Sequence, residues 1–188
     1  EFAKSGAKVV VNYNSNKKAA DEIVAQIKDN GGEAVTFQAN VAVKADVDRL
    51  VQATLDAFNG RIDILFNNAG TLLERATIET MSEKLWDDVM AVNAKSVFLC
   101  TNAIIPIMKK QGFGKIINMT SVAARNGGGP GAGAYSASKA AVLTLTKNLA
   151  KELTQHGIWV NGISPGVIAT NFHDTFSSAE MRENFKKA

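Results

Sequence analysis

The sequence predicts an α/β protein built on a doubly wound parallel sheet, and two observations point to this class. Short, continuously apolar runs rich in β-branched residues alternate with longer segments whose apolar residues recur at helical spacing. Strands that are apolar along their whole length are buried on both faces. We therefore expect helices on both faces of the sheet and right-handed crossovers between the strands.

The expected strands are short runs, each of which leads into a helical segment. They are residues 8–13, 33–39, 62–68, 115–121 and 158–164.

Four helices are expected over residues 17–30, 44–58, about 82–111 and about 134–155. The first shows the pattern clearly, because Ile23, Val24 and Ile27 share one face and the pair Gly31-Gly32 provides a stop.

The length suits one domain, so residues 1–188 are expected to form a single domain in which 165–188 is a substrate-lid region. Net charge is +3 and the lysines are scattered, which argues against a nucleic-acid partner. No stretch of 18 apolar residues occurs, and we expect no membrane span. A signal peptide is also lacking, and a cytoplasmic location is expected.

Cysteine and histidine are scarce in this sequence. Cys100 is the only cysteine, which excludes a disulfide within the chain and fits a reducing compartment. It lies in an apolar stretch and is expected to be a small core residue. His156 and His173 are too few for a histidine-rich site, and we expect no metal.

Polar residues follow every expected strand. In open parallel sheets, ligands bind beyond the carboxyl ends of the strands, so these clusters are the candidate binding residues. They are Asn12-Tyr13, Asn40-Val41, Asn67–Gly70, Thr120-Ser121 and Pro165-Gly166.

The densest glycine run, RNGGGPGAGAYSASKAA at residues 125–141, allows two interpretations. It contains the spacing G-x-G-x-x-G/A twice, from Gly127 and from Gly129, as a phosphate-binding turn would. Such a turn must follow a strand directly, yet five residues separate Ser121 from Gly127. A flexible loop that brings Tyr135 to a substrate is the better interpretation.

Tyr135 and Lys139 are spaced i and i+4, on one face of the expected helix. A phenol has a pKa of about 10, and lowering it to about 7 requires roughly 4 kcal/mol of stabilisation of the phenolate. One ammonium about 5 Å away supplies ~3 kcal/mol at an effective dielectric of ~20. Together with Ser121, whose hydroxyl can bind a carbonyl oxygen, the pair predicts carbonyl polarisation with proton donation. A tyrosine and a lysine at i and i+4 are also common by chance, so this pair alone does not establish a catalytic role.

Five motifs, in order and spacing, resemble the short-chain dehydrogenase/reductase family over essentially the whole chain. They are NNAG at 67–70, VNAKSVF at 92–98, INMTS at 117–121, YSASK at 135–139 and SPGVIAT at 164–170. The resemblance implies a Rossmann-like fold and an oxidoreductase that moves hydride between a nicotinamide and a carbonyl compound or secondary alcohol. It is strongest to the group of 3-oxoacyl-acyl-carrier-protein reductases and sugar dehydrogenases, which implies a 3-oxoacyl thioester or keto-sugar substrate.

The resemblance also implies roles for individual catalytic residues. Tyr135 would exchange the proton at the substrate oxygen, and Ser121 would position and polarise that oxygen. Lys139 would lower the tyrosine pKa and hold the nicotinamide ribose. Asn93 would anchor a water between Lys139 and solvent, although it could equally be a polar helix residue bonded to backbone.

The implied cofactor-binding residues begin at the second strand of the family, where relatives that prefer NAD carry an acid. This chain has no acid there, so NADP(H) is the expected cofactor, with NAD(H) as the second candidate. Asn40 replaces an aspartate that is common at the adenine. The full set is Asn12, Tyr13, Asn40, Val41, Asn68, Ala69, Gly70, Tyr135, Lys139, Pro165, Gly166 and Ile168.

The family begins with a strand and a TGxxxGIG turn, and this chain contains neither. The resemblance implies that the first strand, missing between 8–13 and 62–68, and the last strand are absent from residues 1–188. These residues alone are expected to bind the cofactor weakly. The family also implies a homotetramer packed through the long helix and the tyrosine helix. A non-catalytic fragment or relative that serves as a binding or assembly unit is the alternative function.

Overall fold

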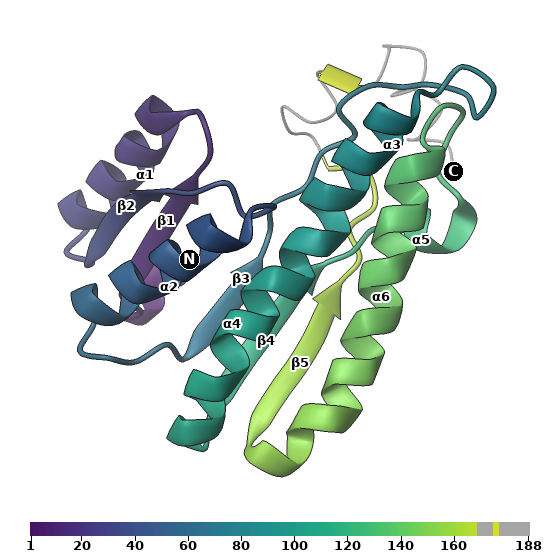
Figure 1. The fold of residues 1–188 in the computed structure, drawn as a ribbon. Coiled ribbons are helices and arrows are strands. Elements are labelled where there is room, and N and C mark those ends of the chain that lie inside the picture. Colours follow the sequence, from purple (N-terminus) through teal and green to yellow (C-terminus); the bar gives the residue numbers. More distant parts are fainter. Residues whose placement is uncertain (169–174, 177–188) are drawn as a thin grey trace.

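A computed structural model of the chain describes residues 1–168 and 175–176. Strands and helices alternate along the chain as the sequence predicts (Figure 1). The strands are β1 (Val9–Tyr13), β2 (Ala34–Gln38), β3 (Ile64–Asn67), β4 (Gly114–Met119) and β5 (Ile158–Ile163). The helices are α1 (Lys17–Asp29), α2 (Lys44–Ala57), α3 (Glu83–Met90), α4 (Ser96–Gln111), α5 (Ala123–Asn126) and α6 (Gly133–Leu153), with 3₁₀ turns at Ala3–Ser5 and Thr154–His156.

All strand pairs are parallel, and they form two separate sheets. One has the order β1-β2 and the other β3-β4-β5. Within the described residues no ladder joins β1 to β3, and Figure 1 shows the two sheets set apart. The break falls between the two strands where the resemblance implies a missing one.

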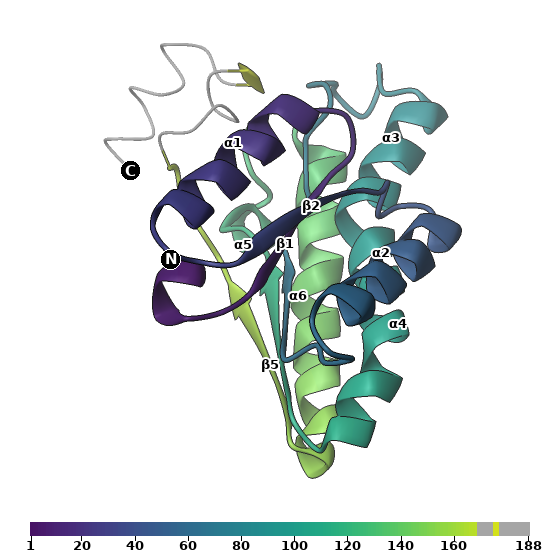
Figure 2. The same ribbon diagram turned by 90° about the vertical axis from the view of Figure 1, so that its left-hand side faces the viewer.

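Helices lie on both sides of the fold, as a doubly wound sheet requires. Figure 2 shows α1 and α2 on opposite sides of β1–β2, whereas α4 and α6 cover one face of β3–β4–β5. Residues of β4 and β5 alternate between buried and more exposed for most of their length, so one face of this sheet carries the core. No described helix crosses its other face, where Ile64, Phe66, Trp159 and Ile163 are exposed. Helices therefore lie on both sides of the described fold as predicted, although α4 and α6 both cover the same face of β3–β4–β5.

The core lies between β3–β4–β5 and the helices α4 and α6. Its most deeply buried side chains include Met108, Ile116, Leu153 and Ile158. Gly114 is required at the start of β4, because a Cβ there would lie 2.3 Å from the sulfur of Met108. Burial of Cys100 agrees with the prediction of a core residue, and it raises the pKa of that thiol to about 11.

The long helix expected over 82–111 is interrupted by a π-helical turn at Ala91–Lys95, between α3 and α4. Ser82 caps the N-terminus of α3 by accepting a hydrogen bond from the Leu85 amide at 3.1 Å. From Glu83 to Gln111 the helix is long and apolar enough to cross a membrane, by length and composition only. It packs on β3 and β4, as the core helix of a globular domain does.

Candidate active site

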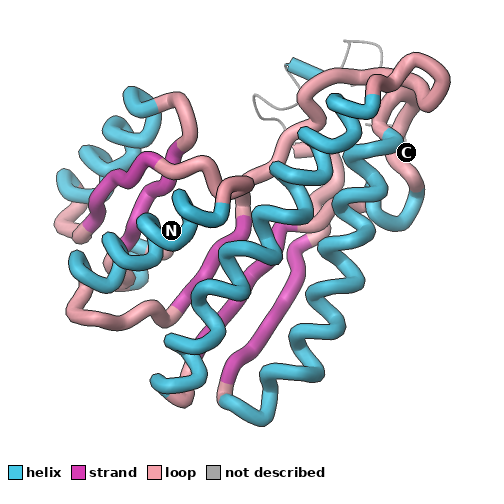
Figure 3. The backbone as a smooth tube through the Cα atoms, in the orientation of Figure 1, coloured by secondary structure: helices cyan, strands magenta, loops and turns pink. Residues whose placement is uncertain are grey.

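The loops that leave the carboxyl ends of β3, β4 and β5 gather at one end of the sheet (Figure 3). They carry Asn68–Gly70, Ser121 and Pro165–Ile168, and α6 begins beside them. The structure thus brings together residues that lie far apart in the sequence. Hydrogen bonds link Ser121 to Tyr135, Lys139 to Met119, and Asn93 to Ser138.

Tyr135 lies in the first turn of α6, and its side chain shares a hydrogen bond with Ser121. Ser121 follows β4, is buried, and accepts a hydrogen bond from the Ala123 amide at 3.1 Å. Burial raises the pKa of Tyr135, and the hydrogen bond with Ser121 lowers it by less. In this structure the pKa of the phenol is therefore raised, so acid–base work near neutrality needs a further positive charge close by.

Lys139 lies one turn further along α6, on the same side as Tyr135. Its Nζ is 5.9 Å from the centroid of the tyrosine ring and donates to the Met119 carbonyl oxygen at 2.8 Å. The side chain is almost fully buried, and this desolvation lowers the pKa of Lys139 to about 8. At pH 7 the Lys139 ammonium is still mostly charged, so it places a positive charge over the tyrosine ring.

Asn93 is fully buried in the π-helical turn. Its Oδ1 accepts from the Thr71 amide at 2.7 Å, and its Nδ2 donates to the Thr71 carbonyl at 2.8 Å and to Ser138 Oγ at 3.0 Å. The side chain is thus bonded to backbone, which is one of the two interpretations left open by the sequence. These bonds hold the loop after β3 against α6, and π-helical turns are frequent at functional sites.

Gly70 leaves room for this arrangement. A Cβ at this position would lie 3.0 Å from Lys139 Nζ and 3.2 Å from Asn93 Oδ1. The backbone at Gly70 therefore passes close to the buried Lys139 side chain. On their other side Asn68, Ala69 and Gly70 are exposed to solvent. Glycine at position 70 therefore lets the backbone pass close to the side chains of both Lys139 and Asn93.

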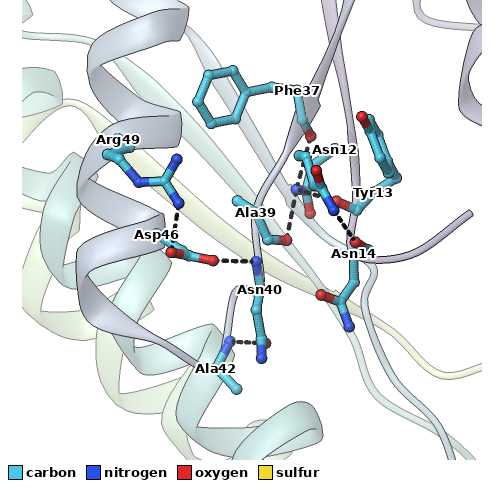
Figure 4. A network of polar contacts seen from close by, with 10 residues as sticks. Asn12, Tyr13, Asn14, Phe37, Ala39, Asn40, Ala42, Asp46 and Arg49 are labelled. Carbon is cyan, nitrogen blue, oxygen red and sulfur yellow. Dashed lines mark hydrogen bonds and ion pairs between the residues drawn. The ribbon is translucent and has the colours of Figure 1, made fainter. Parts of the chain in front are cut away.

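A second polar cluster lies beyond the carboxyl ends of β1 and β2 (Figure 4). Asn12 Nδ2 donates to the Ala39 carbonyl at 3.0 Å, which ties the two strands together. The Asn40 amide donates to Asp46 at 2.8 Å, and Arg49 donates to the same carboxylate at 2.6 Å. These bonds lower the pKa of Asp46, and they fix Asn40 on α2.

An open cavity of about 430 Å³ lies at this cluster. Exposed Asn14 lines it together with Asn40, whereas the amide nitrogen of Asn12 is already engaged with β2. Tyr13 and Val41, the other two residues predicted here, are partly buried. Asn14, which is not among the cofactor-binding residues that the resemblance implies, therefore has the more accessible side chain.

The glycine run does not follow a strand directly, because α5 separates it from β4. Gly127 and Gly128 both have positive φ, which favours glycine. Ser136 Oγ donates to the Gly127 carbonyl at 2.7 Å and ties the run to the tyrosine helix. The geometry matches a loop that supports Tyr135 and not a phosphate-binding turn.

Sequence reasoning missed two groups near the mouth of the site. Arg75 donates to the Pro130 carbonyl at 2.8 Å and to the Phe176 carbonyl at 2.5 Å. Ser138 joins Asn93 to the Tyr135 carbonyl. Neither role could be predicted from the sequence, because Arg75 and Ser138 bond to residues that lie far from them in the chain. His173 and most of the proposed lid lie outside the described residues, and exposed Gly166 and Ile168 are its last described part before the gap.

Comparison with known proteins gives consistent matches. The family model described as short chain dehydrogenase matches residues 1–181. A 3-oxoacyl-[acyl-carrier-protein] reductase of Synechocystis is 48% identical over 181 residues, covering 94% of this chain and 70% of the relative. One of Staphylococcus aureus is 39% identical over 183 residues, covering 97% of this chain and 73% of the relative.

Solved structures agree with these matches. The NADH-dependent reductase A1-R′ complexed with NAD has a TM-score of 0.83 at 34% identity, covering 89% of this chain and 71% of that chain. A dehydrogenase/reductase from Sinorhizobium meliloti has a TM-score of 0.89 at 32% identity, covering 99% and 71%.

Proposed function

Because this chain belongs to the short-chain dehydrogenase family, we propose that the protein reduces a carbonyl group, or oxidises a secondary alcohol, with a nicotinamide dinucleotide. The observation that carries the proposal is the cluster of Ser121, Tyr135 and Lys139 at the carboxyl ends of the strands. A 3-oxoacyl thioester is the first substrate class, since the relatives of highest identity described above are named for it. A keto-sugar compound is the second.

Proton transfer is the part of the chemistry that these residues would perform. The dinucleotide, when bound, supplies or accepts the hydride. The hydroxyls of Ser121 and Tyr135 would both donate to the substrate oxygen, and Tyr135 would pass its proton to that oxygen as negative charge develops. The Lys139 ammonium lies 5.9 Å from the centroid of the Tyr135 ring. A cation at about 6 Å stabilises a phenolate by about 3 kcal/mol at an effective dielectric of ~20.

Reprotonation of Tyr135 would run through Lys139. The Asn93 side chain is already bonded to Thr71 and Ser138. A water that links Lys139 to solvent would therefore be held by the main chain of the π-helical turn, with the side chain fixing the shape of that turn.

For the cofactor we propose NADP(H), with NAD(H) as the second candidate. The end of β1 runs Asn12, Tyr13, Asn14, and it has no carboxylate to repel a 2′-phosphate. Asn14 and Asn40 would face the adenosine, Asn68–Gly70 the middle of the dinucleotide, and Pro165, Gly166 and Ile168 its carboxamide. The similarity to a solved NADH-dependent reductase supports NAD(H) as the second candidate.

We also propose that residues 1–188 belong to one cytoplasmic domain with a lid at 165–188, and that copies assemble as a homotetramer through α4 and α6. Phe98 supports this assembly, because it is a large apolar side chain on α4 that is 53% exposed.

The test is steady-state kinetics of the full-length protein with a 3-oxoacyl thioester and a keto-sugar acid, each with NADPH and NADH. Turnover of the thioester with NADPH is expected. Tight cofactor binding without turnover of any carbonyl compound would instead favour the non-catalytic alternative.

A further inference from the structure

Thr120 occupies a particular place in the fold, between the two site residues Met119 and Ser121. It is buried just past the end of β4. Its amide donates to the Ile163 carbonyl at 2.8 Å, and its Oγ1 donates to the same oxygen at 2.9 Å. The side chain therefore adds a second hydrogen bond to the backbone contact between the end of β4 and the end of β5.

A second hydroxyl extends this contact. Thr120 Oγ1 and Ser164 Oγ are 2.5 Å apart. Because Thr120 gives its single hydroxyl proton to Ile163, Ser164 is the donor in this pair. Next along both strands, the Val122 amide donates to the Pro165 carbonyl at 3.0 Å. The two hydroxyls thus bridge the two segments between the backbone bonds made by Thr120 and by Val122.

The bridge lies between groups that the site brings together. The Met119 carbonyl accepts from Lys139, and Ser121 shares a hydrogen bond with Tyr135. On the other side, Ser164 leads directly into Pro165 and Gly166. Thr120 therefore lies in the chain of contacts that connects Ser121 to the Pro165-Gly166 segment.

We propose that Thr120 is a positioning residue whose hydroxyl holds the Ser164–Gly166 segment at a fixed separation from Ser121. The inference rests on the proposed function, in which that segment lies beside the nicotinamide carboxamide. Loss of the hydroxyl leaves Ser164 without its buried acceptor, so the segment shifts to find another partner. The nicotinamide half of the cofactor would be affected, and the adenosine half would not.

The test compares two ligands of the full-length protein by calorimetry. NADPH contains the nicotinamide, whereas 2′-phospho-ADP-ribose lacks it. The variant Thr120→Val keeps the shape of the side chain and removes the hydroxyl. It is expected to bind NADPH about tenfold more weakly, and to bind 2′-phospho-ADP-ribose within about twofold of the original protein. NADH and ADP-ribose replace this pair if they bind more tightly.

Two further variants sharpen the test. Thr120→Ser keeps the hydroxyl and should restore NADPH affinity, whereas Ser164→Ala should weaken it in the same direction. Thr54→Val is the matched control, because Thr54 also donates its hydroxyl to a backbone carbonyl, that of Leu50 at 2.7 Å, but within α2. It should leave both affinities unchanged.

Equal loss of affinity for both ligands in Thr120→Val, or no loss for either, would overturn the inference and leave the proposed function intact. Failure of the unaltered full-length protein to bind either dinucleotide would overturn the proposed function and the inference together.

Discussion

The Nζ of Lys139 donates a 2.8 Å hydrogen bond to the carbonyl oxygen of Met119, two residues before Ser121. This bond fixes the end of β4 to the tyrosine helix, and it holds the ammonium 5.9 Å from the Tyr135 ring. The lysine thus has both a structural and an electrostatic relation to the residues proposed for proton transfer.

Replacement of Lys139 by Met should remove the electrostatic part and keep the volume. The proposal expects kcat to fall at least about 100-fold, because no cation remains to stabilise the phenolate. Thermal unfolding near pH 7 should change little because two effects oppose each other: the variant loses the hydrogen bond to Met119 but also the desolvation penalty of a buried ammonium. Kinetics and calorimetry of Lys139→Met measure both, and a variant with normal kcat would remove Lys139 from the mechanism.

The pH dependence of stability gives an independent check on the buried lysine. Burial lowers the pKa of Lys139 to about 8, below the value of 10.5 that applies when the chain is unfolded. Between these values the unfolded state binds more protons, so the free energy of unfolding rises with pH. Relative to Lys139→Met, the original protein should gain up to about 3 kcal/mol from pH 8 to above 10.5. Denaturant unfolding at several pH values measures this gain, and equal pH dependence of the two proteins would contradict it.

Asn93 should be essential for the shape of the site. Asn93→Ala loses the bonds to Thr71 and Ser138 and leaves the Thr71 backbone groups unpaired, so we expect about 2–4 kcal/mol lower stability and weaker cofactor binding. Asn102→Ala is the matched control, an exposed asparagine on the adjoining α4, and its stability should stay within about 0.5 kcal/mol. Equal effects of the two substitutions would show that Asn93 has no special role.

Cofactor choice should respond to charge at the end of β1. In Asn14→Asp a carboxylate enters the cavity beside Asn40, where it would repel a 2′-phosphate. The ratio of kcat/KM for NADPH to that for NADH should fall at least about tenfold. Asn30→Asp, an exposed change at the far end of α1, controls for net charge. An unchanged ratio in Asn14→Asp would place the 2′-phosphate elsewhere.

Periodicity in the sequence predicted the strands and main helices, because apolar spacing reflects which face of each element is buried. The break at Ala91–Lys95 was not predicted, since a π-helical turn around Asn93 depends on bonds to Thr71, far from it in the chain. Exposure of Phe66 and Trp159 was also not predicted. The sequence of an apolar strand has the same pattern whether its second face is covered by a helix or exposed to solvent.

The candidate site followed a similar rule. Spacing placed Tyr135 and Lys139 on one face of a helix, the place of Ser121 at the end of a strand added its hydroxyl, and the resemblance added Asn93. The hydroxyl bridge of Thr120 and Ser164 could not be predicted, because it joins the ends of two strands whose register is set only by folding. The raised pKa of Tyr135 likewise could not be predicted from the sequence, since it arises from burial of the side chain in the folded structure.

Turnover of a 3-oxoacyl thioester with NADPH, compared between the full-length protein and its Tyr135→Phe variant, tests the central claim most directly. The variant loses one oxygen atom and with it the proposed proton donor, while the helix and Lys139 remain. We expect kcat to fall about 100- to 10,000-fold with cofactor affinity nearly unchanged. A Tyr135→Phe variant that turns over the thioester as fast as the original protein would contradict the account.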